Sequence, residues 1–303
     1  MRLPVIIESL RPAQWIKNLA VLAAVILNGQ LFNQPVLLAS LAALIAFCLF
    51  SSASYLINDI IDIDKDRIHP IKKNRPIARG DLAPSAAATL SILLLLSGLS
   101  LSINVSPGFF LLSLFFCLLQ FGYTFFLKKK AVLDIIGIAT FFIIRAFAGE
   151  IASGYHLPVW IMLTVIFLSL FIASGKRRSE LINTGSKTRN AIRSYSRSVL
   201  NFYTTMFAVC TLVTYAMFTF FEEPIRFQGL IHNFLLDNFP AILDRKWYMV
   251  TLFPVIFGIM RYGQIIFEMQ EGERPERLVA TDIPLIFSVL LWGMMIITLV
   301  YVL

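Results

Sequence analysis

Charged residues are scarce in this chain: only 15% of its 303 residues are Asp, Glu, Lys or Arg, and 58% are hydrophobic. Ordinary soluble domains carry about 25% charged residues, so this balance excludes that class. The length would allow two soluble domains, but the apolar residues gather in repeated long runs, which predict one integral membrane domain over residues 1–303. Because these runs are continuous rather than alternating, we expect an all-α polytopic protein and not a β-barrel.

Cysteine is also rare, and its three copies, Cys48, Cys117 and Cys210, lie inside apolar runs. Their spacing fits neither a metal site nor a disulfide framework, so they are predicted core residues. The chain has no Gly-x-Gly-x-x-Gly, P-loop, His-Glu-x-x-His or Gly-x-Ser-x-Gly pattern, so nucleotide-binding folds and hydrolase triads find no support. The first apolar run lacks a small-residue cleavage site and is interpreted as a retained span.

The apolar runs predict nine transmembrane helices. We expect them near residues 17–33, 36–57, 83–104, 107–128, 132–153, 158–175, 199–221, 247–268 and 282–302. Most of the 26 Lys and Arg residues fall in loops on one side, while the opposite loops hold only Arg226, Arg245 and Lys246. The positive-inside rule therefore places the N-terminus in the cytoplasm and the C-terminus outside. It also explains the net charge of +8 without a nucleic-acid partner.

An acidic segment opens the first cytoplasmic loop, residues 58–82. On a helix at about 100° per residue, Asp59 and Asp66 lie about 20° apart and Asp62 about 60° away, while Asp64 points elsewhere. Like charges at such spacings repel, so we expect a cation between them. Oxygen ligands favour Mg²⁺, or Mn²⁺, over zinc. The predicted ligands are Asn58, Asp59, Asp62 and Asp66; the alternative is a solvated charged loop.

Basic residues near predicted helix ends are candidate phosphate ligands. Lys72 and Arg75 follow the acidic segment and could meet phosphate oxygens. Lys17, beside Asn18, is either an interfacial side chain or a ligand of an anionic substrate. The basic loop 176–198 is either a positive-inside loop or a cationic lid that closes over phosphates.

One arginine lies deep inside the fifth predicted span. Arg145 comes eleven residues after Asp134, so the two share a helix face about 16 Å apart along the axis. An ionisable residue inside a span usually faces a polar interior, so Arg145 is predicted to line a cavity. In the outer loop 222–246 we expect a short surface helix and no chemistry. Asp282, which begins the last predicted span, either completes the polar ring of the site or caps its helix, and we expect the cap.

Together these features predict transfer from a diphosphate ester within the membrane. Acids would hold Mg²⁺, the metal would stabilise diphosphate as a leaving group, and basic residues would neutralise the remaining charge. The alternative from another class is a transporter, whose broken helices usually carry Gly or Pro in mid-span. Here Pro35, Pro107 and Pro158 fall at span ends, although Pro254 and Pro284 do not.

The pattern Asn58-Asp59-x-x-Asp62-x-x-x-Asp66, followed by Arg75-Pro76 and Gly80, resembles the first Asp-rich motif of the UbiA superfamily of intramembrane prenyltransferases. Other segments are similar to one branch, the decaprenyl-phosphate phosphoribosyltransferases. They are Arg11-Pro12-x-x-Trp15-x-Lys17-Asn18, His69-Pro70-x-Lys72, Leu127-Lys128 to Asp134, Arg145-Ala146-x-Ala148-Gly149 and Gly175-Lys176-Arg177-x-x-Glu180-Leu181. The resemblance covers residues 11 to about 181, and the remainder matches in hydropathy only.

This resemblance implies a UbiA-like bundle with a cytoplasm-facing cavity in the inner membrane, and a role in cell envelope biosynthesis. It implies Mg²⁺-dependent transfer of a 5-phosphoribosyl group from 5-phosphoribosyl 1-diphosphate to a polyprenyl phosphate such as decaprenyl phosphate. Asp59, Asp62 and Asp66 would be catalytic and hold the metal. Substrate ligands would be Lys17, Asn18, Lys72, Arg75, Tyr123, Lys128, Asp134, Arg145, Lys176, Arg177 and Glu180. The alternative within the superfamily moves a prenyl group from a prenyl diphosphate to an aromatic acceptor.

Overall fold

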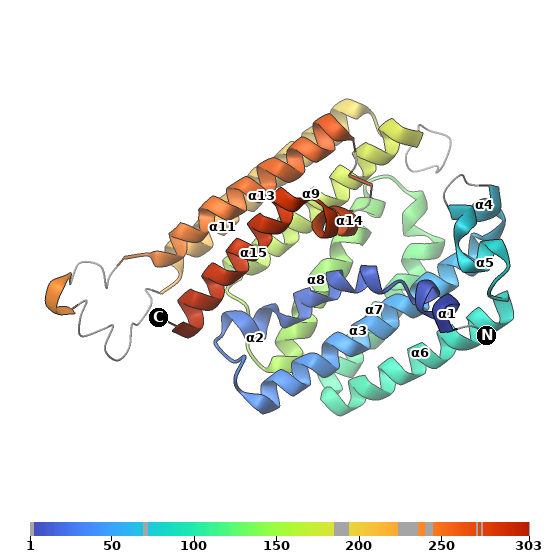
Figure 1. Ribbon diagram of the computed structural model, residues 1–303, viewed down its shortest axis with the longest axis horizontal. Helices are drawn as coiled ribbons and strands as arrows, with labels where there is room; N and C mark the ends of the chain where they lie inside the picture. The colour runs from blue at the N-terminus through green and yellow to red at the C-terminus, as the bar shows by residue number, and fades with distance from the viewer. Residues whose placement is uncertain are drawn as a thin grey trace. The chain divides into compact units, whose positions relative to one another are not determined.

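The structure, a computed structural model, describes residues 3–68, 72–184, 194–223, 236–239, 245–270, 272–273 and 275–302. Every regular element within these ranges is a helix, so the all-α expectation is confirmed (Figure 1). Eight of the described helices are long and apolar enough to cross a membrane. A ninth span is counted when Leu3–Leu10 and Pro12–Leu27, which meet at a 48° bend, are taken together.

The chain forms two compact units. Unit 1 comprises Met1–Ala23, Asn33–Phe126 and Ile144–Gly154. Its elements, with the last turns of α8 (Leu133–Ser153), are α1 (Leu3–Leu10), η1 (Pro12–Leu22), α3 (Gln34–Ile61), α4 (Ile63–Ile68), η2 (Lys72–Asn74), α5 (Pro76–Arg79), α6 (Pro84–Val105) and α7 (Pro107–Phe125).

Phenylalanines hold the long helices of unit 1 together. The ring of Phe47 on α3 lies 4.8 Å from that of Phe116 and 6.0 Å from that of Phe109, both on α7. Tilted and edge-on ring pairs of this kind add to the stabilisation from burial alone. At the far end of α8 a side chain at Gly149 would place its Cβ 2.1 Å from the Val21 carbonyl oxygen. Glycine is therefore required for α8 to approach η1 so closely.

Unit 2 comprises Ala24–Phe32, Leu127–Ile143 and Tyr155–Leu303. Besides α2 (Ala23–Leu27) and the start of α8, its elements are η3 (Leu127–Lys129), α9 (Val159–Thr184), α11 (Arg197–Phe221), η6 (Trp247–Thr251), α13 (Leu252–Gln264), η7 (Ile265–Met269), α14 (Pro275–Thr281), α15 (Ile283–Ile297) and η8 (Thr298–Val302). A cluster of buried side chains around Phe171, Tyr262 and Ile266 forms part of its core.

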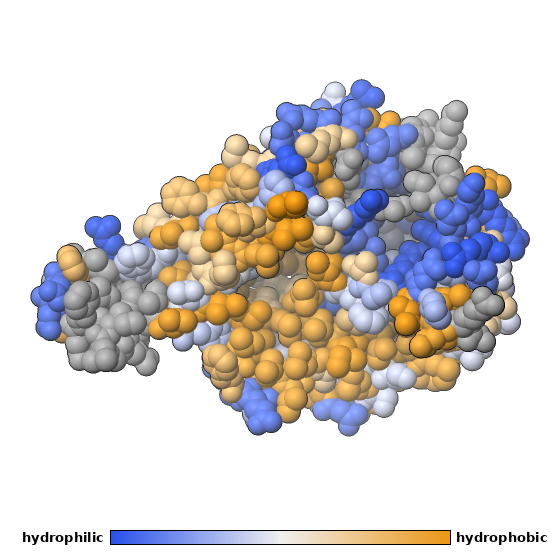
Figure 2. All heavy atoms as spheres, in the orientation of Figure 1, coloured by the Kyte–Doolittle hydropathy of each residue, from blue (hydrophilic) through white to orange (hydrophobic). Residues whose placement is uncertain are grey.

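Large apolar side chains cover the outside of the helices. On α6, Ile92, Leu93, Leu96 and Ile103 are all more than half exposed. Figure 2 shows hydrophobic residues over the part of unit 1 where Figure 1 places α6. Exposed apolar side chains of this kind pack well against lipid chains, which agrees with a multi-pass membrane protein.

Two predicted boundaries are wrong. The first span was expected at residues 17–33, but the chain is helical from Leu3, is bent at Arg11, and forms a 3₁₀ segment from Pro12 to Leu22. The sixth was expected to end at 175, but α9 continues to Thr184, so the basic loop expected over 176–198 begins as helix. The helix continues because its basic residues 177 and 178 are buried and bound to other side chains.

Candidate active site

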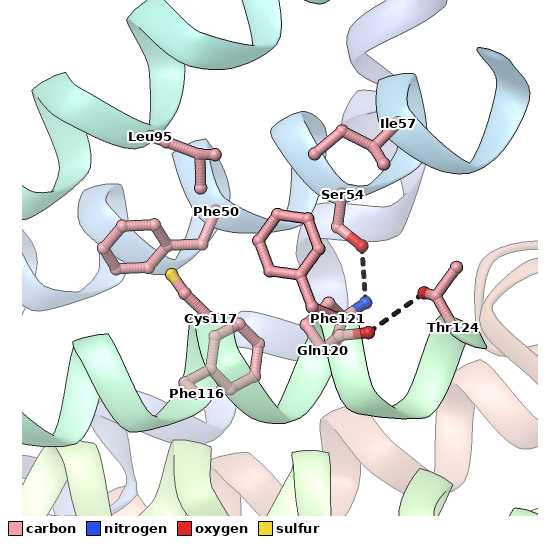
Figure 3. A pocket seen from close by; sticks show the side chains of 9 residues that line it. All are labelled: Phe50, Ser54, Ile57, Leu95, Phe116, Cys117, Gln120, Phe121 and Thr124. Atoms are coloured by element: carbon pink, nitrogen blue, oxygen red, sulfur yellow. Dashed lines mark hydrogen bonds between the residues drawn. The ribbon is translucent and has the colours of Figure 1, made fainter. Parts of the chain in front are cut away.

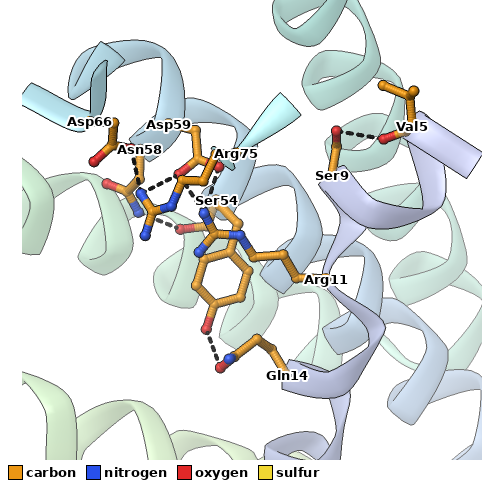
Figure 4. A network of polar contacts seen from close by, with 10 residues as sticks. Val5, Ser9, Arg11, Gln14, Ser54, Asn58, Asp59, Asp66 and Arg75 are labelled. Carbon is orange, nitrogen blue, oxygen red and sulfur yellow. Dashed lines mark hydrogen bonds and ion pairs between the residues drawn. The ribbon is translucent and has the colours of Figure 1, made fainter. Parts of the chain in front are cut away.

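Two buried aspartates of unit 1 meet on one guanidinium group. Helix α3 ends at Ile61 and α4 begins at Ile63, and this break turns Asp66 back towards Asp59 (Figure 4). Nη1 of Arg75 lies 3.0 Å from Oδ1 of Asp59 and 2.5 Å from Oδ2 of Asp66. Asp59 and Asp66 are 4% and 3% exposed, so the two negative charges are nearly withdrawn from solvent. Burial of this kind requires close cationic partners.

A second arginine binds the same carboxylate from another segment. Arg11 lies between α1 and η1, and its Nη2 is 2.6 Å from both oxygens of Asp59. Its guanidinium also lies 4.9 Å from the ring centroid of Tyr55, one turn before Asp59 on α3. Arg11 has a φ of 54°, in the left-handed region that non-glycine residues seldom adopt. The ion pair therefore comes with a strained backbone position.

The other two predicted metal ligands lie differently. Asp62 sits at the helix break and pairs with Lys65 at 3.7 Å. Asn58 accepts a hydrogen bond of 3.2 Å from Thr124 and donates one of 3.5 Å to Ser54. Asp64 is exposed, as expected. The single continuous helix on which four ligands would share one face is wrong, because the helix breaks at Asp62.

The aspartate pair fits a hard divalent cation. Both carboxylates offer oxygen ligands, and because one nitrogen of Arg75 contacts an oxygen of each, the two carboxylates lie close together. Mg²⁺ commonly takes one or two carboxylates and completes its shell with water and phosphate oxygens. Among the described residues no three His, Cys, Asp or Glu side chains form a metal-binding group. A cation bound by Asp59 and Asp66 would therefore take further ligands from water or substrate.

Three more predicted substrate ligands lie in the same unit and are joined to neutral side chains. Lys17 donates to Gln14 at 2.6 Å, and the same Gln14 oxygen accepts from Tyr55 at 3.1 Å. Asn18 is fully buried and accepts a 2.7 Å hydrogen bond from Nε of Arg145. The guanidinium of Arg145 also lies 5.3 Å from the ring centroid of Phe116. Arg145 is thus held firmly inside the unit.

A small pocket lies between α3, α6 and α7 (Figure 3). Its walls are mainly apolar, with Phe50 and Leu95 among them, but polar side chains line one end. There Gln120 donates to Ser54 at 2.5 Å, and Thr124 donates to the Gln120 carbonyl oxygen at 2.9 Å. Because Thr124 also binds Asn58, these contacts fix the end of α3 that carries Asp59.

Two other predicted ligands in unit 1 lie at helix ends. Lys72 begins the short η2, and Tyr123 is on the last turn of α7; both are half-buried. The motif residues His69 and Pro70 lie outside the described residues.

A second buried ion-pair cluster lies in unit 2. Asp134 on α8 and Arg177 on α9 are each 1% exposed, and their Oδ2 and Nε atoms are 2.5 Å apart. Arg177 also pairs with Glu180, and Asp134 accepts a 2.7 Å hydrogen bond from Tyr195. Burial and this hydrogen bond raise the pKa of the Tyr195 hydroxyl, which stays a neutral donor. The predicted residues Asp134, Arg177 and Glu180 are therefore brought together.

The remaining predicted ligands of unit 2 are Lys128 in η3 and Lys176 on α9, both half-buried. Sequence reasoning gave no individual role to Arg11, Tyr55 or Tyr195. Arg11 is 48 residues from Asp59, and Tyr195 is 61 residues from Asp134. Contacts between residues so far apart in the chain leave no periodic pattern in the sequence. The one sequence feature that pointed to Arg11 was its place in the N-terminal segment that is similar to the phosphoribosyltransferase branch.

The fold and its sites define a class: a helical membrane protein with a buried pair of aspartates bound by arginines. Residues 19–281 match the model of the UbiA prenyltransferase family, and the chain belongs to that family. The resemblance noted from the motifs is thus confirmed.

Similar proteins agree with this assignment. Decaprenyl-phosphate phosphoribosyltransferase of Corynebacterium glutamicum is 34% identical, over 98% of this chain and 86% of the relative. The protein of the same name from Mycolicibacterium smegmatis is 37% identical, over 95% and 89%. A solved UbiA homolog from Archaeoglobus fulgidus, bound to DMAPP and Mg²⁺, superposes with a TM-score of 0.65 at 18% identity, over 97% and 99%. This last likeness concerns the fold alone.

Proposed function

We propose that this enzyme transfers a 5-phosphoribosyl group from 5-phosphoribosyl 1-diphosphate to a polyprenyl phosphate, with release of diphosphate. The observation that carries the proposal is the similarity, over nearly the whole chain, to two relatives named decaprenyl-phosphate phosphoribosyltransferase. The buried aspartates and arginines of unit 1 support it, because a diphosphate and its divalent cation require both acidic and basic partners. The enzyme is a membrane transferase of the UbiA family.

The reaction breaks the bond between C1 of the ribose and the diphosphate oxygen. A phosphate oxygen of the lipid forms the new bond to C1, and because a phosphate monoester is already anionic, no strong general base is needed. Mg²⁺ held by Asp59 and Asp66, with Asp62 and Asn58 as further predicted ligands, would supply charge that stabilises the leaving diphosphate. We assign the neutralisation of phosphate charge beside the two buried aspartates to Arg75, which binds both of them.

The other predicted ligands divide between the two units. In unit 1 we assign phosphate or ribose contacts to Lys17, Asn18, Lys72, Tyr123 and Arg145. In unit 2 we assign phosphate contacts to Lys128, Lys176 and Arg177. Asp134 and Glu180 bind Arg177 from two directions, which supports a role for them in holding its guanidinium in one orientation.

We place the protein in the cytoplasmic membrane with the aspartate pair on the cytoplasmic side. Most Lys and Arg residues of the sequence fall in loops on that side of the predicted topology, which supports this orientation. The donor is a water-soluble sugar phosphate, and the acceptor is a lipid in the bilayer. Both substrates can therefore reach an active site at the cytoplasmic membrane surface.

The test is a turnover assay in nanodiscs with labelled 5-phosphoribosyl 1-diphosphate and decaprenyl phosphate, with and without Mg²⁺. We expect label in the lipid only when Mg²⁺ is present. No transfer here, together with activity on geranyl diphosphate and an aromatic acceptor, would assign the protein to prenyl transfer instead. No activity in either assay from a folded protein would overturn both assignments.

A further inference from the structure

Arg11 occupies the edge of Asp59 that a divalent cation would use. One nitrogen, Nη2, lies 2.6 Å from both carboxylate oxygens, and the Asp59 side chain is only 5% exposed. Metal ions such as Mg²⁺ bind carboxylate oxygens at about 2.1 Å. A cation at that distance and a guanidinium at hydrogen-bond distance cannot share the same edge, so one of them excludes the other.

We propose that Arg11 is a positioning residue: it is the resident counter-cation of Asp59 and leaves this carboxylate when a divalent cation binds there. The inference rests on the proposed function, which places such a cation at Asp59 and Asp66. The two aspartates carry two negative charges, and Arg11 and Arg75 carry two positive charges. Adding a divalent cation while both arginines stay would leave excess positive charge in a buried site, which is strongly unfavourable.

Arg11, rather than Arg75, is the guanidinium that leaves. Arg75 contacts both aspartates with one nitrogen and lies nine residues from Asp66, so a short connection holds it in place. Of the two aspartates, Arg11 contacts only Asp59, and it comes from a segment 48 residues away. Its departure breaks fewer ion pairs and leaves Arg75 beside the carboxylates.

The structure gives Arg11 a second partner and a place to bend. Its guanidinium already lies 4.9 Å from the ring of Tyr55, and this cation–π contact does not depend on Asp59. Arg11 also lies at the 48° bend between Leu3–Leu10 and Pro12–Leu27, and its φ of 54° is in the left-handed region. Strained non-glycine residues persist only when their surroundings hold them, and they cluster at ligand-binding sites. The Asp59 contact is thus one of the interactions that hold this strained position in place.

The experiment measures Mn²⁺ binding to the full-length protein in nanodiscs by electron paramagnetic resonance, without substrate. We expect Arg11→Gln to bind Mn²⁺ about tenfold more tightly than the wild type, because the competing charged hydrogen bonds are gone. Arg11→Lys keeps the positive charge but loses the planar guanidinium group, so its Mn²⁺ affinity should lie between those of the wild type and Arg11→Gln. The control is Arg79→Gln: Arg79 is a nearby arginine that pairs with Glu8 and Asp81, and its removal should leave Mn²⁺ affinity unchanged.

The outcomes separate this inference from the proposed function. If the wild type binds Mn²⁺, Asp59→Asn abolishes that binding, and Arg11→Gln binds equally or more weakly, the metal site stands and the role of Arg11 is refuted. If the wild type, Arg11→Gln and Asp59→Asn all fail to bind Mn²⁺, the inference about Arg11 is refuted, and the proposed function is decided by the turnover assay alone. If Arg11→Gln does not fold, Arg11→Lys must still bind Mn²⁺ more tightly than the wild type, or the inference fails.

Discussion

At the scale of single residues, burial separates the acids of the segment around Asp62. Asp59 and Asp66, on either side of it, are buried and share Arg75, whereas Asp64 has a 93% exposed side chain and only a 3.9 Å contact with Arg67. An exposed ion pair of that kind contributes little free energy, while a buried, shared one fixes geometry. The same residue type therefore has two different roles within eight positions.

This contrast gives the first prediction. Asp59→Asn and Asp66→Asn should each lower phosphoribosyl transfer about a hundredfold or more, because each removes one oxygen ligand with its charge from the site. Asp64→Asn, the matched control in the same segment, should keep near wild-type turnover. Initial rates in nanodiscs at saturating Mg²⁺ measure the effect. Full activity in Asp59→Asn or Asp66→Asn would remove the aspartate pair from the mechanism.

Arg145 carries the second prediction at this scale. Its guanidinium is buried, bound to Asn18 and packed over Phe116. If it also binds a substrate phosphate, Arg145→Lys should keep part of the charge interaction but lose the fork geometry, and the KM for the donor should rise about tenfold. Thermal unfolding of the same variant separates the two roles. A lower Tm with an unchanged KM would make Arg145 purely structural.

At the scale of elements, the sequence was informative where signals are local. Pro35 and Pro107, noted at predicted span ends, lie at the starts of α3 and α7, and Asp282 caps α15 as expected, accepting a 3.0 Å hydrogen bond from the Leu285 amide. The break at Asp62 and the bend at Arg11 were not foreseen. Both lie beside side-chain pairs between residues distant in the chain, Arg11–Asp59 and Arg75–Asp59, which helical periodicity does not encode.

The cap of α15 provides an element-scale prediction with a pH dependence. Asp282 accepts from Arg261 at 2.7 Å, and this hydrogen bond lowers the pKa of Asp282. Asp282→Ala should cost about 1 kcal/mol of stability by removing the cap, while Asp282→Asn, which can still cap, should cost less. Because the folded pKa is lowered, the ion-pair contribution is present above the unfolded pKa and disappears as pH falls through the folded one. The Tm difference between wild type and Asp282→Asn should therefore shrink at acidic pH; a constant difference would contradict the ion pair.

At the scale of the whole molecule, composition and the lengths of the apolar runs were sufficient for the fold class. Continuous apolar runs require helices in lipid, and the eight or nine candidate spans of the described chain follow from them. The division of the chain into two compact units could not be predicted from these runs. Both units draw on three separate stretches of chain, and α8 gives its first turns to one and its last turns to the other. A single membrane domain over residues 1–303 stays a prediction.

Orientation in the membrane is the last prediction, and it concerns the chain as a whole. Nine spans place the termini on opposite sides, and the concentration of Lys and Arg on one side places the N-terminus in the cytoplasm. Alkaline phosphatase, which is active only outside the cytoplasm, should be active when fused after Leu303 and inactive when fused within the loop 58–82. If Leu3–Leu10 and Pro12–Leu27 together do not span the bilayer, eight spans remain. With the loop 58–82 still in the cytoplasm, both termini would then lie outside, so alkaline phosphatase that is active when fused before Met1 would contradict the nine-span arrangement. An inactive C-terminal fusion would contradict the predicted orientation.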